Sequence, residues 1–562
     1  ISQELARAVF GTNNVDNCSR YCQAPATVGL WRTVGYGGDA GTMDDIRAAD
    51  LVLMVGTNTD QSHPVLAAHL RAAQKQHGQT HIVADIRAHL TAQRADVFIR
   101  PTPGTDLIWM SAVARYILDQ GWEDRAFLDQ HVNHEASYRE SLEPFTLAYA
   151  EQMTGIAQDT LVDIARRVAQ AETVCGLWAM GVTQHAMGSD TSTALSNLLL
   201  VTGNFGKPGG NNLHTMLLPI LGHTDERNPK YKRTAHHKMF PIAGIYPPNI
   251  LPDEILHDGE DRVRAVFVDS ANPLMTWADS QAYEKAFASL ELSVVIDVTL
   301  TETARAADYV LPASSQFEKW EATGFNLEFP VNGFHLRHPL FPPKQGTLSE
   351  PEIYTRLLEK MGVLPSRFPK LERLARLEAK RGLYLGTLAS LGALLARNRQ
   401  WIPHAASIVY RTIGKTLPDN AAATAPLLAL THVYAQQYYR EVKRAGHQGN
   451  RLTLGSNLFQ AILKGRSGVT LSEHRFQDVW SLVAHRDRRV HLAIPEMLDE
   501  LASLTPGADD QSYPFVLMAG ERRSYNANQI YRDPAWRKVD PHGAMRMHPV
   551  DAERLGIAHG DK

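Results

Sequence analysis

The chain has 562 residues and a formal net charge of −3, with 44% hydrophobic and 21% charged residues. This length exceeds what one compact core usually holds, so we expect three or more domains. The near-neutral charge balance excludes a global attraction to nucleic acid or to an anionic membrane. Three cysteines are too few for a disulfide framework, which fits a reducing compartment. No apolar run in the sequence is long enough to span a bilayer.

Neither end of the sequence has the features of a natural terminus. The first residue is Ile1 rather than a methionine, and the chain stops at Lys562, soon after a helical stretch at 551–556 that should lead into a strand. We therefore expect that segments have been cut away on both sides, so that the absence of a targeting signal from this sequence proves nothing. The expected location is cytoplasmic, with the periplasm left open for the same reason.

Residues 1–150 alternate short apolar runs with amphipathic helical stretches. The runs predict strands at 51–55, 81–84 and 97–99, and the amphipathic stretches predict helices at 64–76 and 105–118. Because the strands are continuously apolar and separated by helices, they are typical of a parallel sheet covered on both faces.

Residues 151–364 repeat this alternation and predict a second domain of the same kind. Strands are expected at 173–178, 265–268 and 293–298, and a helix at 191–201 is ended by Gly203 and Asn204. The predicted fold class is therefore α/β, with two doubly wound parallel-sheet domains.

Residues 365–510 differ in character and are predicted to be a helical insertion and connector. From Arg367 to Lys415 there are ten Lys or Arg and only two Glu. The apolar run at 383–396 is too short to span a membrane, and we interpret it as a buried helix of the inserted subdomain. The alternative is docking to a partner subunit or to a membrane surface. Residues 511–562, with a strand expected at 514–518, open a final domain.

The segment from residue 11 to residue 30 concentrates polar and thiol side chains. Such density makes poor core material, because each buried polar group needs a partner. Cys18 and Cys22 alone cannot build a zinc site, which needs four ligands. A thiolate at Cys22, beside Arg20, is suited to be the single protein ligand of a metal carried by a large cofactor. The alternative is that both thiols are buried small hydrophobes.

Glycines and polar residues gather at the turns that follow the predicted strands. In open parallel sheets ligands bind at the carboxyl ends of the strands, and helix N-termini suit phosphates. No GxGxxG or GxxxxGK[ST] occurs at these turns, so an ordinary nicotinamide or P-loop nucleotide site is unsupported. Helix capping is the alternative role for several of them, and a lone His such as His185 is more often packed or at the surface.

Taken together, these segments resemble the molybdopterin oxidoreductase family, also called the dimethyl sulfoxide reductase family, and within it the catalytic subunits of formate dehydrogenases. The motifs that carry the resemblance, in the family's order, are GTNNVDNCSRYCQAP, VGTNTDQSHP, ADIR, RPTPGTD, WAMGVTQH, TGNFGKPGG, DSANP and the acidic-aromatic stretch around Glu318. Cys22 occupies the position of the Cys or selenocysteine that holds the metal. The stretch AGERRSYNANQIYRDPAW resembles the start of the domain that closes over the pterins.

The resemblance implies a molybdenum or tungsten ion held by two pterin guanine dinucleotides. It implies two doubly wound domains, a helical insertion and the start of a C-terminal β-barrel-like domain. A [4Fe-4S] cluster is expected only on a segment preceding Ile1. An electron-transfer partner subunit or carrier is expected, without nucleic acid and without a transmembrane segment in this chain.

The resemblance also assigns roles to individual residues. Cys22 is the metal ligand, Gln23 and His185 orient the substrate, and Arg20 holds the loop that carries Cys22. The residues expected to bind the cofactor are Asn14, Gly56, Asn58, His63, Asp85, Arg87, Gly104, Asp106, Met180, Gly181, Gln184, Asn204, Gly206, Lys207, Asp269, Asn272, Asp297 and Asn526.

The expected reaction is the two-electron oxidation of formate to CO2. Two departures from the formate enzymes leave alternatives open: Gln23 stands where they have His, and no equivalent of their Arg follows the turn at 207–214. A nitrate reductase-like reduction of an oxyanion is the alternative on the same scaffold, because the corresponding motif of periplasmic or assimilatory nitrate reductases also ends in Arg-x-Cys. A scaffold subunit of a redox complex that lost its cofactor is the alternative of another class.

Overall fold

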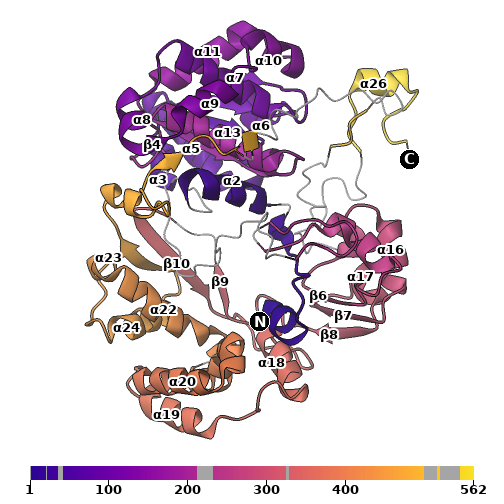
Figure 1. The fold of residues 1–562 in the computed structure, drawn as a ribbon, viewed down its shortest axis with the longest axis vertical. Helices are drawn as coiled ribbons and strands as arrows, with labels where there is room; N and C mark the ends of the chain where they lie inside the picture. The colour runs from indigo at the N-terminus through magenta and orange to yellow at the C-terminus, as the bar shows by residue number, and fades with distance from the viewer. Residues whose placement is uncertain are drawn as a thin grey trace.

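The computed structural model describes most of the chain and arranges it as two α/β bodies and a helical unit (Figure 1). The larger α/β body forms the upper part in this view, the smaller one lies at the lower right, and the helical unit lies at the lower left. The described residues are 2–20, 22–35, 42–211, 232–242, 244–323, 328–418, 420–495, 497–498, 515–518 and 545–561.

The larger body is built on a four-stranded parallel sheet with the order β3-β2-β1-β5. The strands are β1 (Leu51–Val55), β2 (Thr80–Ala84), β3 (Val97–Ile99) and β5 (Val174–Trp178). All five residues of β1 are buried, as a central strand covered on both faces requires. The parallel α/β sheet predicted from the apolar runs is therefore confirmed.

The placement of β5 corrects the predicted domain boundary at residue 150. We expected this strand in a second domain, but it pairs with β1 in parallel, Leu51 beside Val174 and Val55 beside Trp178. Apolar runs predict that a strand is buried but do not say which sheet it joins, because pairing is set by the crossover connection. The first α/β unit thus continues past residue 150.

Helices cover both faces of this sheet, as the predicted doubly wound arrangement requires. Leu51, Leu53 and Val55 share a core with α2 (Ala24–Val34), α7 (Asp106–Asp119) and α13 (Gly188–Val201). Val52 and Met54 point to the other face, where α3 (Met43–Ala48) and α5 (Pro64–His77) pack. The third cysteine, Cys175, is buried in that second core.

The smaller body holds a three-stranded parallel sheet with the order β6-β7-β8. Its strands are β6 (Ala265–Asp269), β7 (Leu292–Asp297) and β8 (Tyr309–Pro312), and α16 (Ser280–Ala288) and α17 (Glu302–Ala306) pack against one face. The other face shares a core with the helical unit, since Ile296 lies in the same cluster as Leu358 and Leu428.

The helical unit packs around a small antiparallel sheet of β9 (Glu321–Thr323), β10 (Val331–Arg337) and β11 (Val469–Glu473). Its longer helices are α18 (Glu350–Lys360), α19 (Pro369–Ala379), α20 (Leu385–Arg397), α22 (Pro426–Gln437) and α24 (Leu454–Lys464). The predicted apolar helix forms as α20 but is only partly buried, because Thr387 and Leu391 alone among its residues are fully enclosed.

The last predicted domain lies largely outside the described residues. Residues 515–518 are described and are not a strand, which corrects the strand expected at 514–518. The helix α26 (Pro549–Arg554) forms as its amphipathic sequence predicts. Within the part of the chain that the structure describes, no helix combines the length and hydropathy needed to cross a bilayer.

Candidate functional site

The N-terminal segment joins the two α/β bodies, and its loop at residues 10–23 lies between them. Leu5 is buried in the core that includes Ile296 of the smaller sheet, and the Phe10 ring lies 5.8 Å from the ring of Phe267 on β6. After residue 23 the chain enters α2, which packs on α13 of the larger body. The loop at 10–23, called the ligand loop below, is therefore held from both sides.

Cys22 lies where the ligand loop reaches the larger sheet. Its amide donates to the carbonyl of Ser19 at 3.1 Å, and its Sγ lies 3.8 Å from Sδ of Met180, two residues after the end of β5. Burial raises the pKa of the half-buried Cys22 thiol, and the neighbouring Cys18 raises it further. The protein alone therefore favours the protonated thiol, and a bound cation is what would ionise it.

Arg20 acts electrostatically on an acid of the same loop. Burial raises the pKa of Asp16 to about 7, against the opposing effects of the Asn17 backbone amide and of the Arg20 charge. Asn14 is exposed nearby, and its amide donates to Thr12 Oγ1 at 3.1 Å. Gln23 is half-buried at the residue before α2.

Two glycines bring the turns after β1 and β5 into backbone contact. The amide of Gly181 donates to the carbonyl of Gly56 at 3.3 Å. A Cβ built on Gly56 would lie 2.6 Å from Gly181 Cα, and one built on Gly181 would lie 2.5 Å from Gly56 Cα. Since no other residue fits such an approach, both positions require glycine. The sequence pattern placed these two turns in different domains, so their meeting was not predicted.

A cluster of titratable groups lies beside this glycine contact. His185 Nε2 hydrogen-bonds the carbonyl of Gly181 at 2.7 Å, so that nitrogen carries the proton. Burial raises the pKa of Asp106, and the neighbouring Asp85 raises this pKa further. The Trp109 indole, which donates a hydrogen bond to Asp106 at 3.0 Å, and the charge of His185 both lower the pKa of Asp106. The structure thus brings together Asp85, Asp106 and His185, all predicted from the sequence.

Two members of the cluster were not predicted. His89 Nε2 lies 3.2 Å from Asp85 Oδ2 in a buried contact, and Trp109 is fully buried beside Asp106. Asp106 and Trp109 lie three residues apart on α7, a spacing that places both on one helical face and was the available signal for Trp109. Asp85 and His89 lie in the turn before α6 (Leu90–Gln93), where no local periodicity indicates their contact.

Asn58 and Thr183 carry buried polar atoms at the carboxyl edge of the larger sheet. Asn58 Nδ2 donates to Gln61 at 3.0 Å, but its Oδ1 has no hydrogen-bond partner among the described residues, and neither does Thr183 Oγ1. Buried polar atoms are normally paired, so these are the places where a bound group would satisfy them.

The remaining predicted residues on this edge line its rim. His63 is exposed, and its Nδ1 lies 2.9 Å from Ser62 Oγ. The amide of Arg87 donates to Asp85 Oδ1 at 2.9 Å. Gly104 and Gln184 are exposed, and Gly104 adopts a left-handed φ of 83° in open space. They lie at the carboxyl edge of the sheet without making a contact that identifies a ligand.

The carboxyl edge of the smaller sheet gathers Asp269, Asn272 and Asp297. Burial raises the pKa of Asp269, which accepts a hydrogen bond from Tyr354 at 2.9 Å. Asn272 Oδ1 accepts from the amide and hydroxyl of Thr303 at 3.1 and 2.8 Å, and Asp297 accepts from the amide of Thr299 at 3.0 Å. The residues converge as predicted, but Asn272 serves the local fold.

Asn204, Gly206 and Lys207 lie at the opposite edge of the larger sheet, which corrects their assignment. Asn204 is fully buried and its Oδ1 accepts from the amide of Val174, at the amino end of β5, at 2.8 Å. Lys207 Nζ donates to the carbonyl of Glu172 at 2.8 Å. A glycine-rich motif predicts the shape of a turn but does not indicate at which edge of the sheet the turn lies. Asn526 lies outside the described residues.

The family model described as "Molybdopterin oxidoreductase" matches residues 1–360. The chain belongs to the molybdopterin oxidoreductase family. The matched range contains the ligand loop and both parallel sheets, and it ends before α19 begins. The resemblance carried by the ordered motifs is thereby confirmed.

Three curated bacterial proteins are similar to this family member. "Probable oxidoreductase YjgC" of Bacillus subtilis (strain 168) is 43% identical over 383 residues, 64% of this chain and 38% of that protein. "Putative formate dehydrogenase YrhE" of the same strain is 42% identical over 358 residues, 60% of this chain and 36% of that protein. A Staphylococcus aureus (strain USA300) protein of the same description is 44% identical over 351 residues, 58% of this chain and 35% of that protein. The chain thus spans little more than a third of their length.

One solved structure supports the fold. Acetylene hydratase from Pelobacter acetylenicus matches with a TM-score of 0.55 at 20% identity, over 64% of this chain and 53% of that chain. At this identity the likeness concerns the arrangement of the backbone and not the reaction.

The family implies a molybdenum or tungsten pterin cofactor, and the residues at the carboxyl edge of the larger sheet fit such a group. Cys22 offers a soft sulfur donor of the kind that such metals accept. The contact of Gly56 with Gly181 keeps side chains out of the space where the two turns meet. Asn58 Oδ1 and Thr183 Oγ1 offer buried acceptors that have no described partner.

Proposed function

We propose that this chain is the catalytic core of a formate dehydrogenase-like oxidoreductase. It would hold molybdenum or tungsten on two pterin guanine dinucleotides, with Cys22 as the protein ligand of the metal. The observation that carries the proposal is the 3.8 Å contact between Cys22 Sγ and Met180 Sδ, which sets the thiol beside the turn after β5. The relatives described as formate dehydrogenases, at 42 and 44% identity, support the choice of substrate.

The bound cofactor would supply a metal that accepts the two electrons released when formate becomes CO2 and a proton. Cys22 would bind the metal as the thiolate. Because burial raises its pKa, the thiol keeps its proton until a cation displaces it. Metal binding at this site is therefore coupled to the loss of a proton from Cys22 Sγ.

His185 would take the proton that formate loses. Its Nε2–H is engaged by the carbonyl of Gly181, which leaves Nδ1 as the acceptor nitrogen. The neighbouring Asp106 interacts electrostatically with His185.

Gln23 and Arg20 would help to bind the substrate. Gln23 adjoins Cys22 and carries an amide that can both donate to and accept from a carboxylate-sized substrate. Arg20, on the ligand loop, would hold that loop and add positive charge near an anion. Electrons would leave through an iron-sulfur cluster and then through a partner subunit or carrier.

The test compares Cys22→Ala with Cys18→Ala, a matched change of the exposed thiol four residues earlier. Formate oxidation with a dye acceptor should fall in Cys22→Ala by more than the roughly 10–100-fold typical of supporting residues around a metal, with little effect in Cys18→Ala. Full activity of Cys22→Ala with intact cofactor would show that the assignment is wrong. Nitrate reduction with a dye donor, measured on the same samples, tests the alternative substrate.

A further inference from the structure

The helices α19 and α20 pack against each other at the end of the molecule away from the larger sheet (Figure 1). We call residues 367–402 the basic hairpin. Its positively charged side chains point outward. The exposed ones are Arg367, Lys370, Arg373, Arg376, Lys380, Arg381, Arg397 and Arg399.

The two carboxylates of the basic hairpin are directed inward and serve the fold. Glu378 accepts from the amides of Gly386 and Thr387 at 2.7 and 2.9 Å, and so caps the start of α20. Glu372 is 6% exposed, and it pairs with Arg367 at 3.1 Å. Since residues 367–402 contain no other acidic side chain, the outer surface carries charge of one sign.

Most of these cations are available to a partner. Arg367 is engaged by Glu372, whereas Lys370, Arg373, Lys380, Arg381, Arg397 and Arg399 form no ion pair with any described residue. On α19 the positions 370, 373 and 377 follow one helical face, and Arg381 lies in the turn just after the helix.

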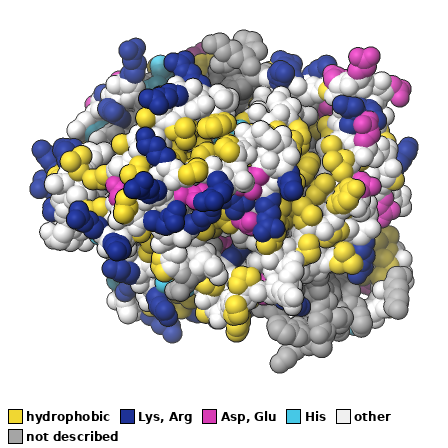
Figure 2. Space-filling model, turned by 90° about the horizontal axis from the view of Figure 1, so that it is seen from below, with side chains coloured by type: hydrophobic (Ala, Val, Ile, Leu, Met, Phe, Trp, Pro, Cys, Tyr) yellow, Lys and Arg dark blue, Asp and Glu magenta, His cyan; other side chains and the backbone are white. Residues whose placement is uncertain are grey.

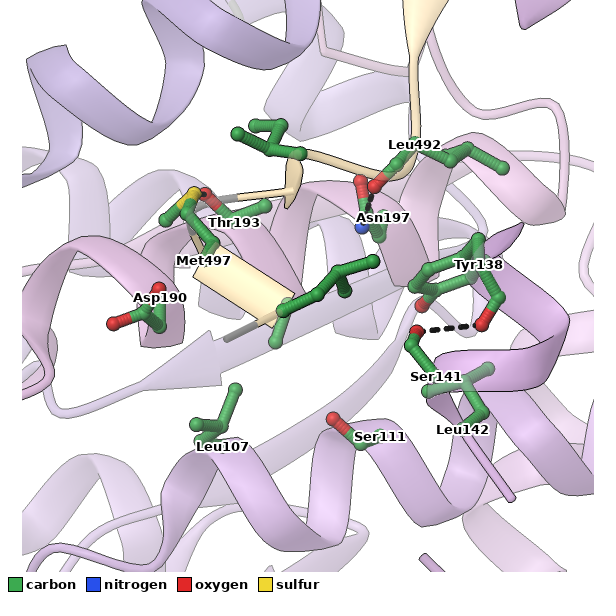
Figure 3. A pocket seen from close by; sticks show the side chains of 13 residues that line it. Leu107, Ser111, Tyr138, Ser141, Leu142, Asp190, Thr193, Asn197, Leu492 and Met497 are labelled. Carbon is green, nitrogen blue, oxygen red and sulfur yellow. Dashed lines mark hydrogen bonds between the residues drawn. The ribbon is translucent and has the colours of Figure 1, made fainter. Parts of the chain in front are cut away.

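Aliphatic side chains lie exposed among the cations. Leu377 is 63% exposed on the basic face of α19, and Ile402 is 54% exposed close in sequence to Arg399. Figure 2 looks onto this end of the molecule and shows dark blue Lys and Arg side chains interleaved with yellow hydrophobic ones. A basic helix with exposed aliphatic groups has the composition of a helix that lies in a lipid headgroup layer.

We propose that the basic hairpin docks the protein onto an anionic lipid surface. The cations would contact headgroup phosphates, and Leu377 and Ile402 would enter the boundary with the acyl chains. A single sign of charge complements a phosphate layer, whereas a protein interface normally also needs groups of the opposite sign for register. The hairpin also lies far from α2, the helix that follows Cys22, so a partner bound here would not face that end of the redox site (Figure 1).

The comparison with the family supports a separate role for this surface. The family model ends at residue 360, before the basic hairpin begins, so the hairpin is not part of the matched pterin-binding scaffold. Lipid docking would place the proposed enzyme at a membrane surface. This proposal does not depend on the reaction of the enzyme or on its metal.

The test measures co-flotation of the purified chain with vesicles of phosphatidylcholine alone or mixed equally with phosphatidylglycerol. The test variant is Lys370→Glu, Arg373→Glu and Arg381→Glu combined. The control reverses three other exposed cations, Lys75→Glu on α5, Lys285→Glu on α16 and Arg305→Glu on α17. Near-ultraviolet circular dichroism checks that both variants fold.

We expect the wild type and the control to float with the phosphatidylglycerol vesicles only, and the test variant to bind about 100-fold more weakly. Binding should also be lost at about 1 M salt, where charges are screened within about 3 Å. Equal binding of the two variants, or no preference of the wild type for phosphatidylglycerol, would overturn the proposal. Binding of the wild type to polyglutamate but not to vesicles would overturn it in favour of an acidic protein.

Discussion

Gly56 and Gly181 touch through their backbones, the amide of Gly181 donating to the carbonyl of Gly56 at 3.3 Å. These residues follow β1 and β5, whose paired ends, Val55 and Trp178, lie side by side in one sheet although they are 123 positions apart in the sequence. The contact fixes the distance between the two turns on which Met180 and Asn58 lie. The proposed cofactor site therefore depends on two positions without side chains.

Gly181→Ala should break this contact. Its Cβ would lie 2.5 Å from Gly56 Cα, which is backbone and cannot rotate away. We expect a loss of about 1–3 kcal/mol in the free energy of unfolding, measured with urea, and reduced pterin content. Gly392→Ala on α20, where a Cβ meets nothing, is the control and should be neutral or slightly stabilising. A fully stable, pterin-loaded Gly181→Ala protein would contradict the account.

The three thiols should react with iodoacetamide in the order Cys18, Cys22, Cys175 in metal-free protein. Cys18 is exposed, Cys22 is half-buried and Cys175 is buried. Because burial raises the pKa of Cys22, its labelling rate should still be rising with pH where that of an ordinary thiol has levelled off. Peptide mass spectrometry of timed samples measures each rate. Fastest labelling at Cys22 would mean that the thiol is activated by a group other than the metal.

Asp16→Asn should change how stability depends on pH. The pKa of Asp16 is raised from 3.8 to about 7 in the folded protein, mainly by burial. Between these pH values the folded protein keeps a proton that the unfolded chain has lost, so this group's contribution to stability falls as pH rises. The variant should therefore gain stability relative to the wild type from pH 4 to pH 7. A difference in unfolding free energy that stays constant with pH would exclude this role.

Glu378→Ala should weaken the helical unit without touching the redox site. The carboxylate accepts two amide hydrogen bonds at the start of α20, and loss of such a cap destabilises a helix by about 0.5–2 kcal/mol. Glu284→Ala, an exposed position on α16, is the matched control and should change stability by less than about 0.5 kcal/mol. Urea unfolding measures both. Equal stability of the two variants would mean that solvent replaces the cap.

The parallel sheets and the turns of the candidate site were predictable because their signals are local. The run at 51–55 is apolar throughout since both faces of β1 are covered, and the glycines at 56 and 181 mark the approach of two backbones. The partial burial of α20 was not predictable from its apolar run. Burial depends on which neighbours a helix finds, and α20 packs mainly against α19.

Features that depend on tertiary pairing could not be predicted from the sequence. The pairing of β5 with β1 depends on a crossover that no local pattern encodes. The side chain of Asn204 was expected to face a ligand, but it satisfies the amide at the start of β5. Polar residues in glycine-rich turns serve ligands and backbones alike, and only their partners distinguish the two roles.

The most direct test of the central claim is the metal and pterin content of the purified protein, expressed with cofactor assembly intact and measured by mass spectrometry. The account predicts one molybdenum or tungsten with two pterin guanine dinucleotides per chain. Neither metal nor pterin in a correctly folded protein would contradict it and would favour a scaffold subunit that has kept the fold without the cofactor.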